Sequence, residues 1–352
     1  EAEEVAERDG APQAIHRVLA TRALIASYRG EYERGEALYQ RQLDLLRGAP
    51  ASRAYSGTLG RYGHLKSRQG DHDAARRLFD RALAMADELG DVGLRAMWLG
   101  SLSRLADRLG ALSEAVAYAE EAIRTVQIHG ERNGLATWEG LLAAAHARVG
   151  RYALAEHHYE RAIAAATATG RTMVRFKHRV GLAYIRIQQG RLDDAERRLV
   201  ELRTEGEALS TPHQSLGGIR VYLGSIYERT GRPDDAQQTF AEAARIARSL
   251  RDPIIEAQVM GLQASYDDDV RAARAAFDAS VRGLLAVDAT YQAALMECRR
   301  AHYEIRHGDD DAARRAIEEA RRLAARFEVD DDAELPRAIR QSEAQLPSES
   351  VE

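Results

Sequence analysis

The sequence predicts an all-α protein made of about eight repeated helix hairpins. The composition is rich in Ala, Leu, Arg and Glu, which all favour helices, and the 352 residues include only seven prolines. Alternation of β-branched and polar residues, which is typical of strands, is scarce. A turn signature also recurs at nearly constant spacing, and this indicates a repeat architecture rather than a set of unrelated domains.

Seven glycines and one aspartate mark the turns of the repeat. Successive turns are 37 to 41 residues apart, and 40 is the commonest spacing. The turns lie near Gly30, Gly70, Gly110, Gly150, Gly190, Gly231, Asp268 and Gly308. Spacing this regular predicts eight copies of one structural unit.

Small and large residues follow each turn at fixed distances. A small residue stands five positions after every turn: Gly35, Ala75, Ala115, Ala155, Ala195, Ala236, Ala273 and Ala313. Four positions further on, most repeats have a large residue, such as Tyr39, Phe79 or Phe240. Steps of four and three place these residues on one helix face, so small residues allow a neighbouring helix to approach and large ones fill the space beside them.

With these offsets the chain resembles the tetratricopeptide repeat (TPR) family, whose unit is a pair of antiparallel helices. The resemblance covers roughly residues 10–328 and is strongest in the sixth repeat, "YLGSIYERTGRPDDAQQTFAEA". It implies a right-handed α-solenoid in which neighbouring hairpins cover each other's apolar faces. The units are about 40 residues long rather than the usual 34, which is similar to the long repeats of bacterial signalling and regulatory proteins.

Both ends of the chain depart from the repeat. Residues 1–9 are expected to be the end of a preceding helix or a linker, so we expect the array or another domain to continue upstream. Residues 329–352 begin with the acidic run 330–332, continue as an expected capping helix over 333–345, and end in a Pro/Ser/Glu tail that we expect to be disordered.

Charge, cysteine content and hydropathy exclude several classes of protein. The net charge of −5 and the pI near 6.2 argue against a protein that binds nucleic acid through bulk charge. No apolar run approaches the ~18 residues that a membrane span needs. The single cysteine, Cys298, excludes an internal disulfide and suits a reducing compartment. We therefore expect a cytoplasmic protein without membrane or direct nucleic-acid binding.

The TPR resemblance further implies that the first helices of the hairpins line an inner groove. Positions of this sequence that match the groove positions of the family are predicted to bind a partner. They are Arg61, His64, Arg68, Arg104, Arg108, Arg148, Lys177, Tyr184, Gln188, Tyr222 and Arg229.

The predicted groove has an excess of positive charge. The first helices over 54–69 and 172–189 contain bases and no acid, although the whole chain is net negative. Arginines at helix C-termini can simply complement the helix dipole, but Arg61, Arg104 and Lys177 lie in the middle of their helices. The pattern predicts a basic groove that attracts an acidic peptide or an anionic ligand.

A second periodic feature is a set of mid-helix glycines. Gly60, Gly100 and Gly140 are 40 residues apart, and Trp98 and Trp138 each precede one of them by two positions. Because a mid-helix glycine costs ~1 kcal/mol relative to alanine, the series indicates that space is needed there. The space would admit either a neighbouring backbone or a ligand, and the tryptophans are expected to belong to the core.

No catalytic residue, metal site or cofactor is predicted. The glycines of "GTLGRYG" (57–63) lie inside an expected helix and lack the strand-turn-helix context of a phosphate loop. His157 and His158 are adjacent, so they point ~100° apart on a helix and cannot easily share a metal. Cys298 and His302 have i, i+4 spacing but no third partner, so a buried cysteine beside a solvated histidine is expected.

The sequence thus predicts a non-catalytic binding scaffold or sensor segment of a larger bacterial-type regulatory protein. Its partner would be an acidic peptide or protein in the basic groove, together with other domains of the same polypeptide. One alternative is a small-molecule-sensing arm that controls an attached NTPase or DNA-binding domain. Another alternative, an enzyme using Cys298 and His302, would require that an activity be lost in Cys298→Ser.

Overall fold

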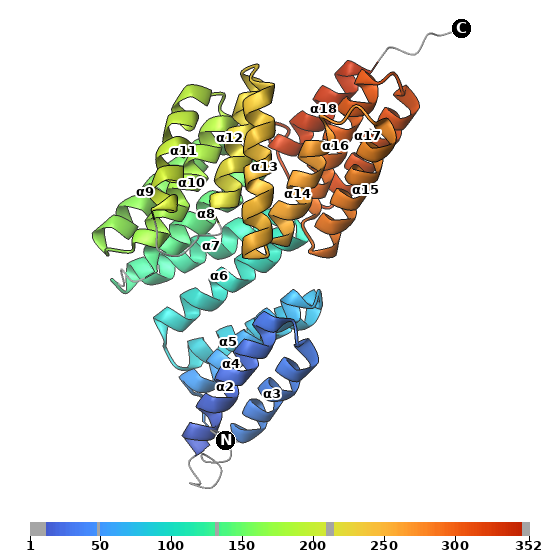
Figure 1. Ribbon diagram of the computed structural model, residues 1–352. Coiled ribbons are helices and arrows are strands. Elements are labelled where there is room, and N and C mark those ends of the chain that lie inside the picture. Colours follow the sequence, from blue (N-terminus) through green and yellow to red (C-terminus); the bar gives the residue numbers. More distant parts are fainter. Residues whose placement is uncertain (1–11, 48–49, 131–133, 209–214, 347–352) are drawn as a thin grey trace. The chain divides into compact units, whose positions relative to one another are not determined.

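The computed structural model describes residues 12–47, 50–130, 134–208 and 215–346, and every regular element in these ranges is an α-helix (Figure 1). The expected all-α architecture is therefore confirmed. The segment 1–9 and the tail beyond residue 346 lie outside the described residues. None of the described helices has the length and apolar character that a membrane-spanning segment requires.

Within the described ranges the helices follow one another as eight hairpins and a final single helix, the arrangement of an α-solenoid. The hairpins are α2 (Pro12–Arg29) with α3 (Tyr32–Leu45), α4 (Arg53–Arg68) with α5 (His72–Glu88), α6 (Val92–Leu109) with α7 (Leu112–Ile128), α8 (Leu135–Val149) with α9 (Tyr152–Ala168), α10 (Thr172–Gln188) with α11 (Leu192–Glu207), α12 (Ser215–Arg229) with α13 (Pro233–Leu250), α14 (Pro253–Ala264) with α15 (Val270–Ala286), and α16 (Thr290–Arg306) with α17 (Asp310–Ala324); α18 spans Glu334–Gln345.

The chain divides into two compact units, which are described separately below. Unit 1 consists of Glu1–Asp107 and Glu114–Leu141. Unit 2 consists of Arg108–Ser113, the turn between α6 and α7, together with Leu142–Glu352. The boundary between the units passes through α8.

The turn glycines end the first helix of each hairpin in the left-handed conformation. Seven of them, including Gly70 and Gly190, have φ between +73° and +102°. In the turn at Gly70 the amide of Asp71 donates to the carbonyl of Lys66, and the amide of Arg191 donates to Arg186 in the turn at Gly190 (3.0 and 2.9 Å). These bonds are the closing bonds of a Schellman motif, which requires a residue that tolerates positive φ.

The seventh hairpin closes its turn differently, because it has Asp268 where the others have glycine. Asp268 has no positive φ. The neighbouring aspartates close the turn instead: the Asp267 side chain accepts from the amide of Asp269, and the Asp269 side chain accepts from Arg271 and Ala272 at the start of α15 (2.9 and 3.1 Å). Side-chain capping thus replaces the glycine motif here.

Large side chains of the second helices pack against glycines of the first helices. A Cβ on Gly63 would lie 2.8 Å from the ring of Phe79, and one on Gly224 would lie 2.3 Å from Phe240. Both phenylalanines are almost completely buried. Gly63 and Gly224 thus leave the space that Phe79 and Phe240 fill.

The glycines at 60 and 100 make room for tryptophan side chains. A Cβ on Gly60 would lie 2.1 Å from the indole of Trp98, and one on Gly100 would lie 2.2 Å from Trp138. Trp98 also donates its Nε1–H to Ser56 Oγ (2.7 Å). The space is thus filled by the indole of the next hairpin, and not by a neighbouring backbone or a ligand, the two occupants that the sequence suggested. The expectation that the tryptophans belong to the core agrees with their burial.

We predict that Gly60→Ala destabilises the protein by ~1–3 kcal/mol, although alanine favours helices, because the new methyl group overpacks the Trp98 site. Urea denaturation followed by far-UV circular dichroism measures the change. Gly218→Ala in α12 is the control, since nothing lies within 4 Å of its Cβ position; it should be neutral or stabilising by up to ~1 kcal/mol. Equal midpoints for the two variants would show that Gly60 has no packing role.

Candidate functional site

The predicted groove residues fall into two groups, one in each unit. Arg61, His64, Arg68 and Arg104 lie on α4 and α6 of unit 1, and we call them the basic cluster. The other seven lie in unit 2: Arg108, Arg148, Lys177, Tyr184, Gln188, Tyr222 and Arg229. The two groups differ in what contacts them.

The basic cluster is tied together by Ser101 of α6. The Ser101 hydroxyl lies 3.4 Å from Nε2 of His64 and accepts from Nη2 of Arg104 at 3.1 Å. Arg68 donates to the backbone carbonyl of Ser27 (3.4 Å). His64 also packs its ring against Phe79, with 4.9 Å between the ring centroids. His64 and Arg104, from two successive hairpins, therefore converge on one hydroxyl.

Arg61 lies against its own helix. Its guanidinium folds back over Gly57, where a Cβ would lie 3.2 Å from Nη1. Its Nε is buried and has no hydrogen-bond partner. The three glycines of "GTLGRYG" thus have three different neighbours, namely the Arg61 guanidinium, the Trp98 indole and the Phe79 ring. All three make space for side chains.

The charge of the basic cluster that the described acids do not neutralise is that of Arg61 and Arg104. Burial lowers the pKa of His64 to about 4, with help from the positive charges of Arg104 and Arg68. Burial also lowers the pKa values of Arg61 and Arg104, although Arg104 remains open to solvent on one side. None of the acidic side chains in the described ranges forms an ion pair with Arg61, His64 or Arg104. Cations held together without a counter-ion favour the binding of an anion.

In unit 2 several of the predicted groove residues contact the C-terminal part of the same chain. The hydroxyl of Tyr184 and Nε2 of Gln188 both donate to the carboxylate of Glu334 at the start of α18 (2.7 and 2.9 Å). The ring of Tyr222 lies beside that of Tyr184, with 5.4 Å between centroids. Burial and the Glu334 carboxylate raise the pKa values of both phenols, to about 12 for Tyr222. An internal carboxylate thus occupies this part of the predicted groove.

The arginines of this group also have internal neighbours. The guanidinium of Arg148 lies 4.0 Å from the centroid of the Tyr291 ring and 5.8 Å from that of Phe327. Arg229 donates to the carbonyl of Ile187 (3.1 Å). Arg108 lies 3.9 Å from a carboxylate oxygen of Asp288. Lys177, in contrast, is exposed.

Two TPR models match the chain, one over residues 52–128 and the other over residues 223–254. Residues 52–128 and 223–254 are thus identified as tetratricopeptide repeats, and the other described hairpins have the same helix-pair fold. A model for anaphase-promoting complex subunit 5 matches residues 255–339. No curated protein matches the chain by sequence.

Solved structures with the same fold include regulatory TPR proteins. Aspartyl phosphate phosphatase F from Bacillus subtilis has a TM-score of 0.66 at 14% identity, covering 93% of this chain and 92% of its own. A Rap protein complexed with competence and sporulation factor has a TM-score of 0.62 at 15% identity, with coverages of 88% and 99%. NprR in complex with its cognate peptide NprX has a TM-score of 0.60 at 12% identity, with coverages of 93% and 98%. At these identities the likeness shows the fold alone.

The cysteine and histidine on the last TPR first helix do not form a reactive pair. Cys298 is buried, and burial raises the pKa of its thiol to about 12, so the thiol stays protonated at neutral pH. Nε2 of His302 lies 3.1 Å from the hydroxyl of Ser342 in α18. The geometry is that of a packed helix pair and gives no thiolate nucleophile.

The adjacent histidines of α9 also lack the geometry of a metal site. The rings of His157 and His158 meet edge-on at 5.2 Å, and His158 stacks on His146 of α8 at 5.4 Å. Among the residues that the structure describes, no three His, Cys, Asp or Glu side chains are placed to hold a metal ion.

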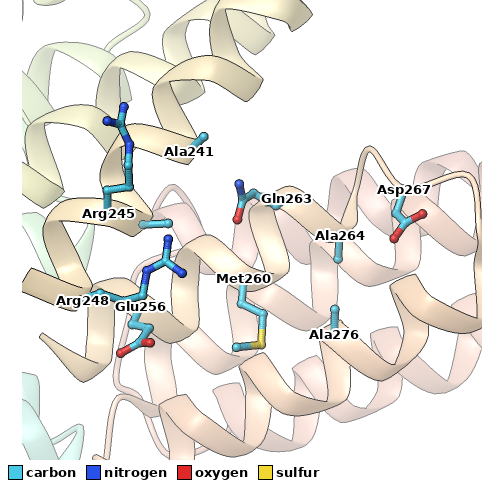
Figure 2. A pocket seen from close by; sticks show the side chains of 10 residues that line it. Ala241, Arg245, Arg248, Glu256, Met260, Gln263, Ala264, Asp267 and Ala276 are labelled. Atoms are coloured by element: carbon cyan, nitrogen blue, oxygen red, sulfur yellow. The ribbon is translucent and has the colours of Figure 1, made fainter. Parts of the chain in front are cut away.

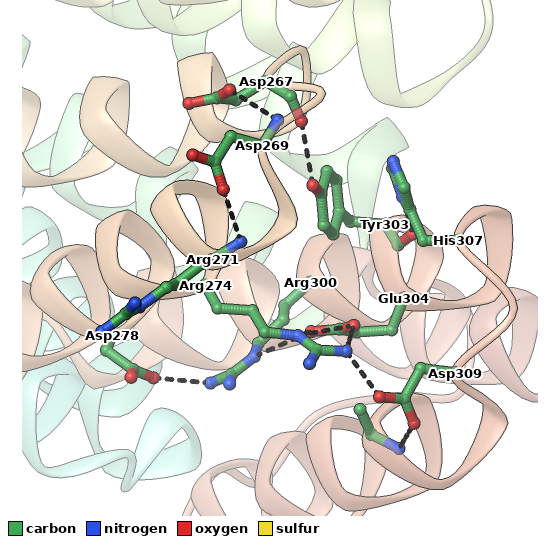
Figure 3. A network of polar contacts seen from close by, with 11 residues as sticks. Asp267, Asp269, Arg271, Arg274, Asp278, Arg300, Tyr303, Glu304, His307 and Asp309 are labelled. Atoms are coloured by element: carbon green, nitrogen blue, oxygen red, sulfur yellow. Dashed lines mark hydrogen bonds and ion pairs between the residues drawn. The ribbon is translucent and has the colours of Figure 1, made fainter.

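A polar network between α15 and α16 holds the last two TPR hairpins together (Figure 3). Glu304 is fully buried and accepts two bonds from Nε of Arg274 (3.0 and 3.1 Å). Arg300 approaches the same carboxylate at 3.8 Å and also donates to Asp278 (2.8 Å). Because Glu304 is neutralised by Arg274 and Arg300, the network has a structural role.

A shallow cleft lies between the second helix α13 and the helices α14 and α15 (Figure 2). Its volume is about 520 Å³, its sides include Arg245, Arg248 and Glu256, and Met260 lies within it. None of the predicted groove residues lines it. Alanines at 241, 244, 264 and 276 leave the space open, and these small residues are the sequence signal that could have revealed it.

The main feature that the sequence interpretation missed is the contact between the C-terminal segment and the TPR turns. Glu334 and Arg337 come from a segment that was expected only to cap the array. A signal was present, because the acidic stretch before α18 complements the basic first helices in charge. Which hairpins it contacts depends on the curvature of unit 2, which a repeat pattern does not determine.

We predict that His64 makes the protein less stable in mild acid. Its pKa of about 4 lies below the ordinary 6.5, so the unfolded chain takes up a proton that the folded state resists. Stability should therefore fall as the pH decreases from about 6.5 to about 4, and His64→Gln should reduce that dependence. Some slope should remain, because His146 also has a pKa of about 4. Urea denaturation at several pH values measures the slope; a His64 imidazole that titrates near 6.5 by NMR would contradict the prediction.

Proposed function

We propose that this chain is a non-catalytic regulatory scaffold whose basic cluster binds an acidic segment of a peptide or protein. The observation that carries the proposal is the group Arg61, His64 and Arg104, which the described acids leave without a counter-ion. In the rest of the described chain many arginines are paired with acids, as Arg76 is with Glu114 (2.6 Å) and Arg232 with Glu196 (2.6 Å). Two arginines without a counter-ion, Arg61 and Arg104, favour an external anion in such a chain.

A carboxylate ligand suits the donors of the cluster. Arg104 can offer a planar fork to a carboxylate, which gives a charge-assisted and geometrically specific hydrogen bond. Ser101 is already linked to both His64 and Arg104, and an anion beside it would stabilise the Arg104 guanidinium and the protonated form of His64. Because Arg104 is exposed, it can meet an incoming ligand before the other members of the cluster do.

Two further observations support a peptide as the ligand. The Rap protein with competence and sporulation factor and NprR with NprX are complexes formed by proteins of the same fold. Within this chain, unit 2 already holds an acidic segment, since Glu334 lies on Tyr184 and Gln188. First helices of these TPR hairpins thus provide donors that suit carboxylates. We place this activity in the cytoplasm, with other domains of the same polypeptide as further partners.

The alternative function is a small-molecule-sensing arm of a larger regulator. The cleft between α13 and α14 supports it, because a volume of about 520 Å³ is within the ~300–1,000 Å³ range of small-molecule sites. Arg245 and Arg248 would provide its charges. The affinity of a ligand for this cleft should fall in Arg248→Gln, and substitutions in the basic cluster should leave it unchanged.

We predict that Arg104→Gln weakens binding of an acidic peptide by ~10-fold, which corresponds to ~1.4 kcal/mol, because one donor of the cluster is lost. Fluorescence anisotropy with a fluorescein-labelled peptide of alternating glutamate and alanine measures the affinity. Arg81→Gln on the exposed face of α5 is the matched control and should leave the affinity unchanged. Equal affinities for the two variants would overturn the proposal.

We also predict that this affinity rises as the pH falls from 7.5 to 5.5. A bound carboxylate stabilises the imidazolium of His64, so binding raises its pKa from about 4 and is coupled to proton uptake. The peptide carboxylates stay ionised in this range. The same anisotropy titration at several pH values tests the coupling, and His64→Gln should abolish it. If the affinity of His64→Gln still depended on pH in this range, the proton taken up on binding would belong to another group.

A further inference from the structure

We propose that the surface of unit 2 contacted by residues 326–337 is a second binding surface for an extended acidic segment, and that the chain's own C-terminal segment occupies it as a displaceable internal ligand. We call these residues the C-terminal strap. This inference concerns a different surface from the basic cluster and does not depend on the function proposed above.

The C-terminal strap crosses two successive turns of the array. After α17 the chain continues without helix from residue 325 to 333. The amide of Glu328 donates to the carbonyl of Gly110 (3.2 Å), and the amide of Asp330 donates to the carbonyl of Val149 (2.9 Å). Arg326 donates to the carbonyl of Arg108 (2.7 Å). The first two are main-chain contacts at the successive turns near Gly110 and Gly150, as expected for recognition of an extended segment, and the third joins a guanidinium to a main-chain carbonyl.

Two turn glycines are shaped for the C-terminal strap. A Cβ on Gly110 would lie 2.3 Å from the carbonyl oxygen of Arg326, and one on Gly150 would lie 2.7 Å from the amide nitrogen of Ala333. Nothing lies within 4 Å of the same position in the turns at Gly70 and Gly190. All four glycines have positive φ. The first pair therefore has a second reason to lack a side chain, namely the close approach of the strap backbone.

Side chains then fix the register of the C-terminal strap. The Glu334 carboxylate receives the bonds from Tyr184 and Gln188 (2.7 and 2.9 Å). Arg337 donates to the carbonyl of Gln188 (3.3 Å) and lies 5.3 Å from the centroid of the Tyr152 ring. A carboxylate held by a phenol and an amide is a directional contact, so it selects the position of one acid in the segment.

The acidic part of the C-terminal strap is held by polar contacts, which makes exchange with another segment feasible. Glu328 and the acids at 330–332 are exposed, and the ion pair of Asp330 with Arg151 (3.2 Å) is open to solvent. Leu335 and Ile339 of α18 are buried in the hydrophobic core formed with α16 and α17. The acidic stretch 328–332 can thus leave the turns at 110 and 150, whereas Phe327 of the strap is buried in the same core and keeps its place together with α18. An external acidic segment with a matching carboxylate could replace the acidic stretch.

The test uses the full chain and a fluorescein-labelled synthetic peptide of residues 325–346. The wild-type chain should bind this peptide weakly, because the internal segment is present at high effective concentration. Glu334→Lys in the chain weakens only the internal contact, so it should increase the affinity for the wild-type peptide by ~10-fold or more. A peptide that carries Glu334→Lys should lose this binding.

A matched pair of glycine variants separates a binding surface from a permanent structural cap. Gly150→Ala and Gly190→Ala both place alanine at a positive φ (+102° and +78°), but only the first blocks the strap. Hydrogen exchange at the amides of Glu328 and Asp330 should accelerate in Gly150→Ala and not in Gly190→Ala, and it should accelerate in wild type when excess peptide is added. If the peptide neither binds better to the Glu334→Lys chain nor accelerates this exchange, the strap is a fixed cap and the proposal fails.

Discussion

The structure depends on the packing of large side chains into places where the opposite helix has glycine. A single helix hairpin cannot bury its own apolar face, so the apolar side chains of each hairpin must pack against the next hairpin. Within a hairpin, Phe79 packs against Gly63 and Phe240 packs against Gly224. Trp98, in contrast, packs against Gly60 of the preceding hairpin. The aromatic–glycine contacts therefore connect hairpins both internally and along the array. They fix the distance between helices, and that distance sets which side chains of the first helices can converge.

The polar residues are distributed over this scaffold according to whether their charges are compensated. Glu304 is buried and neutralised by Arg274 and Arg300, so it contributes to rigidity and specificity rather than to binding. Arg61 and Arg104 of unit 1 have no such counter-ion among the described acids, and burial lowers the pKa of the neighbouring His64. In unit 2 the corresponding positions contact an internal acid, Glu334. The matching first-helix positions thus contact a carboxylate in unit 2, whereas His64 and Arg104 of unit 1 pair with none of the described acids.

The repeat period predicted the fold well, because it depends on local rules. Turn glycines, the small residue five positions later and the large residue after that all follow from helix geometry and are legible in the sequence. The site was only partly predictable. The sequence could place Arg61, His64 and Arg104 on first helices, but it could not show that Ser101 links two of them. Nor could it show that Tyr184 and Gln188 meet Glu334, because contacts between residues about 150 apart depend on the summed curvature of many hairpins.

The amide bonds of Glu328 and Asp330 to the turns of much earlier hairpins have a consequence for how unit 2 comes apart. A linear array of repeats has mainly neighbour contacts, so it can fray from its end one hairpin at a time. A connection between residue 328 and residue 110 joins distant members of the array. Fraying of the last hairpin would then have to break contacts in the middle of the chain as well. Unit 2 should accordingly melt more cooperatively, and form more slowly, than an unconnected array of the same length.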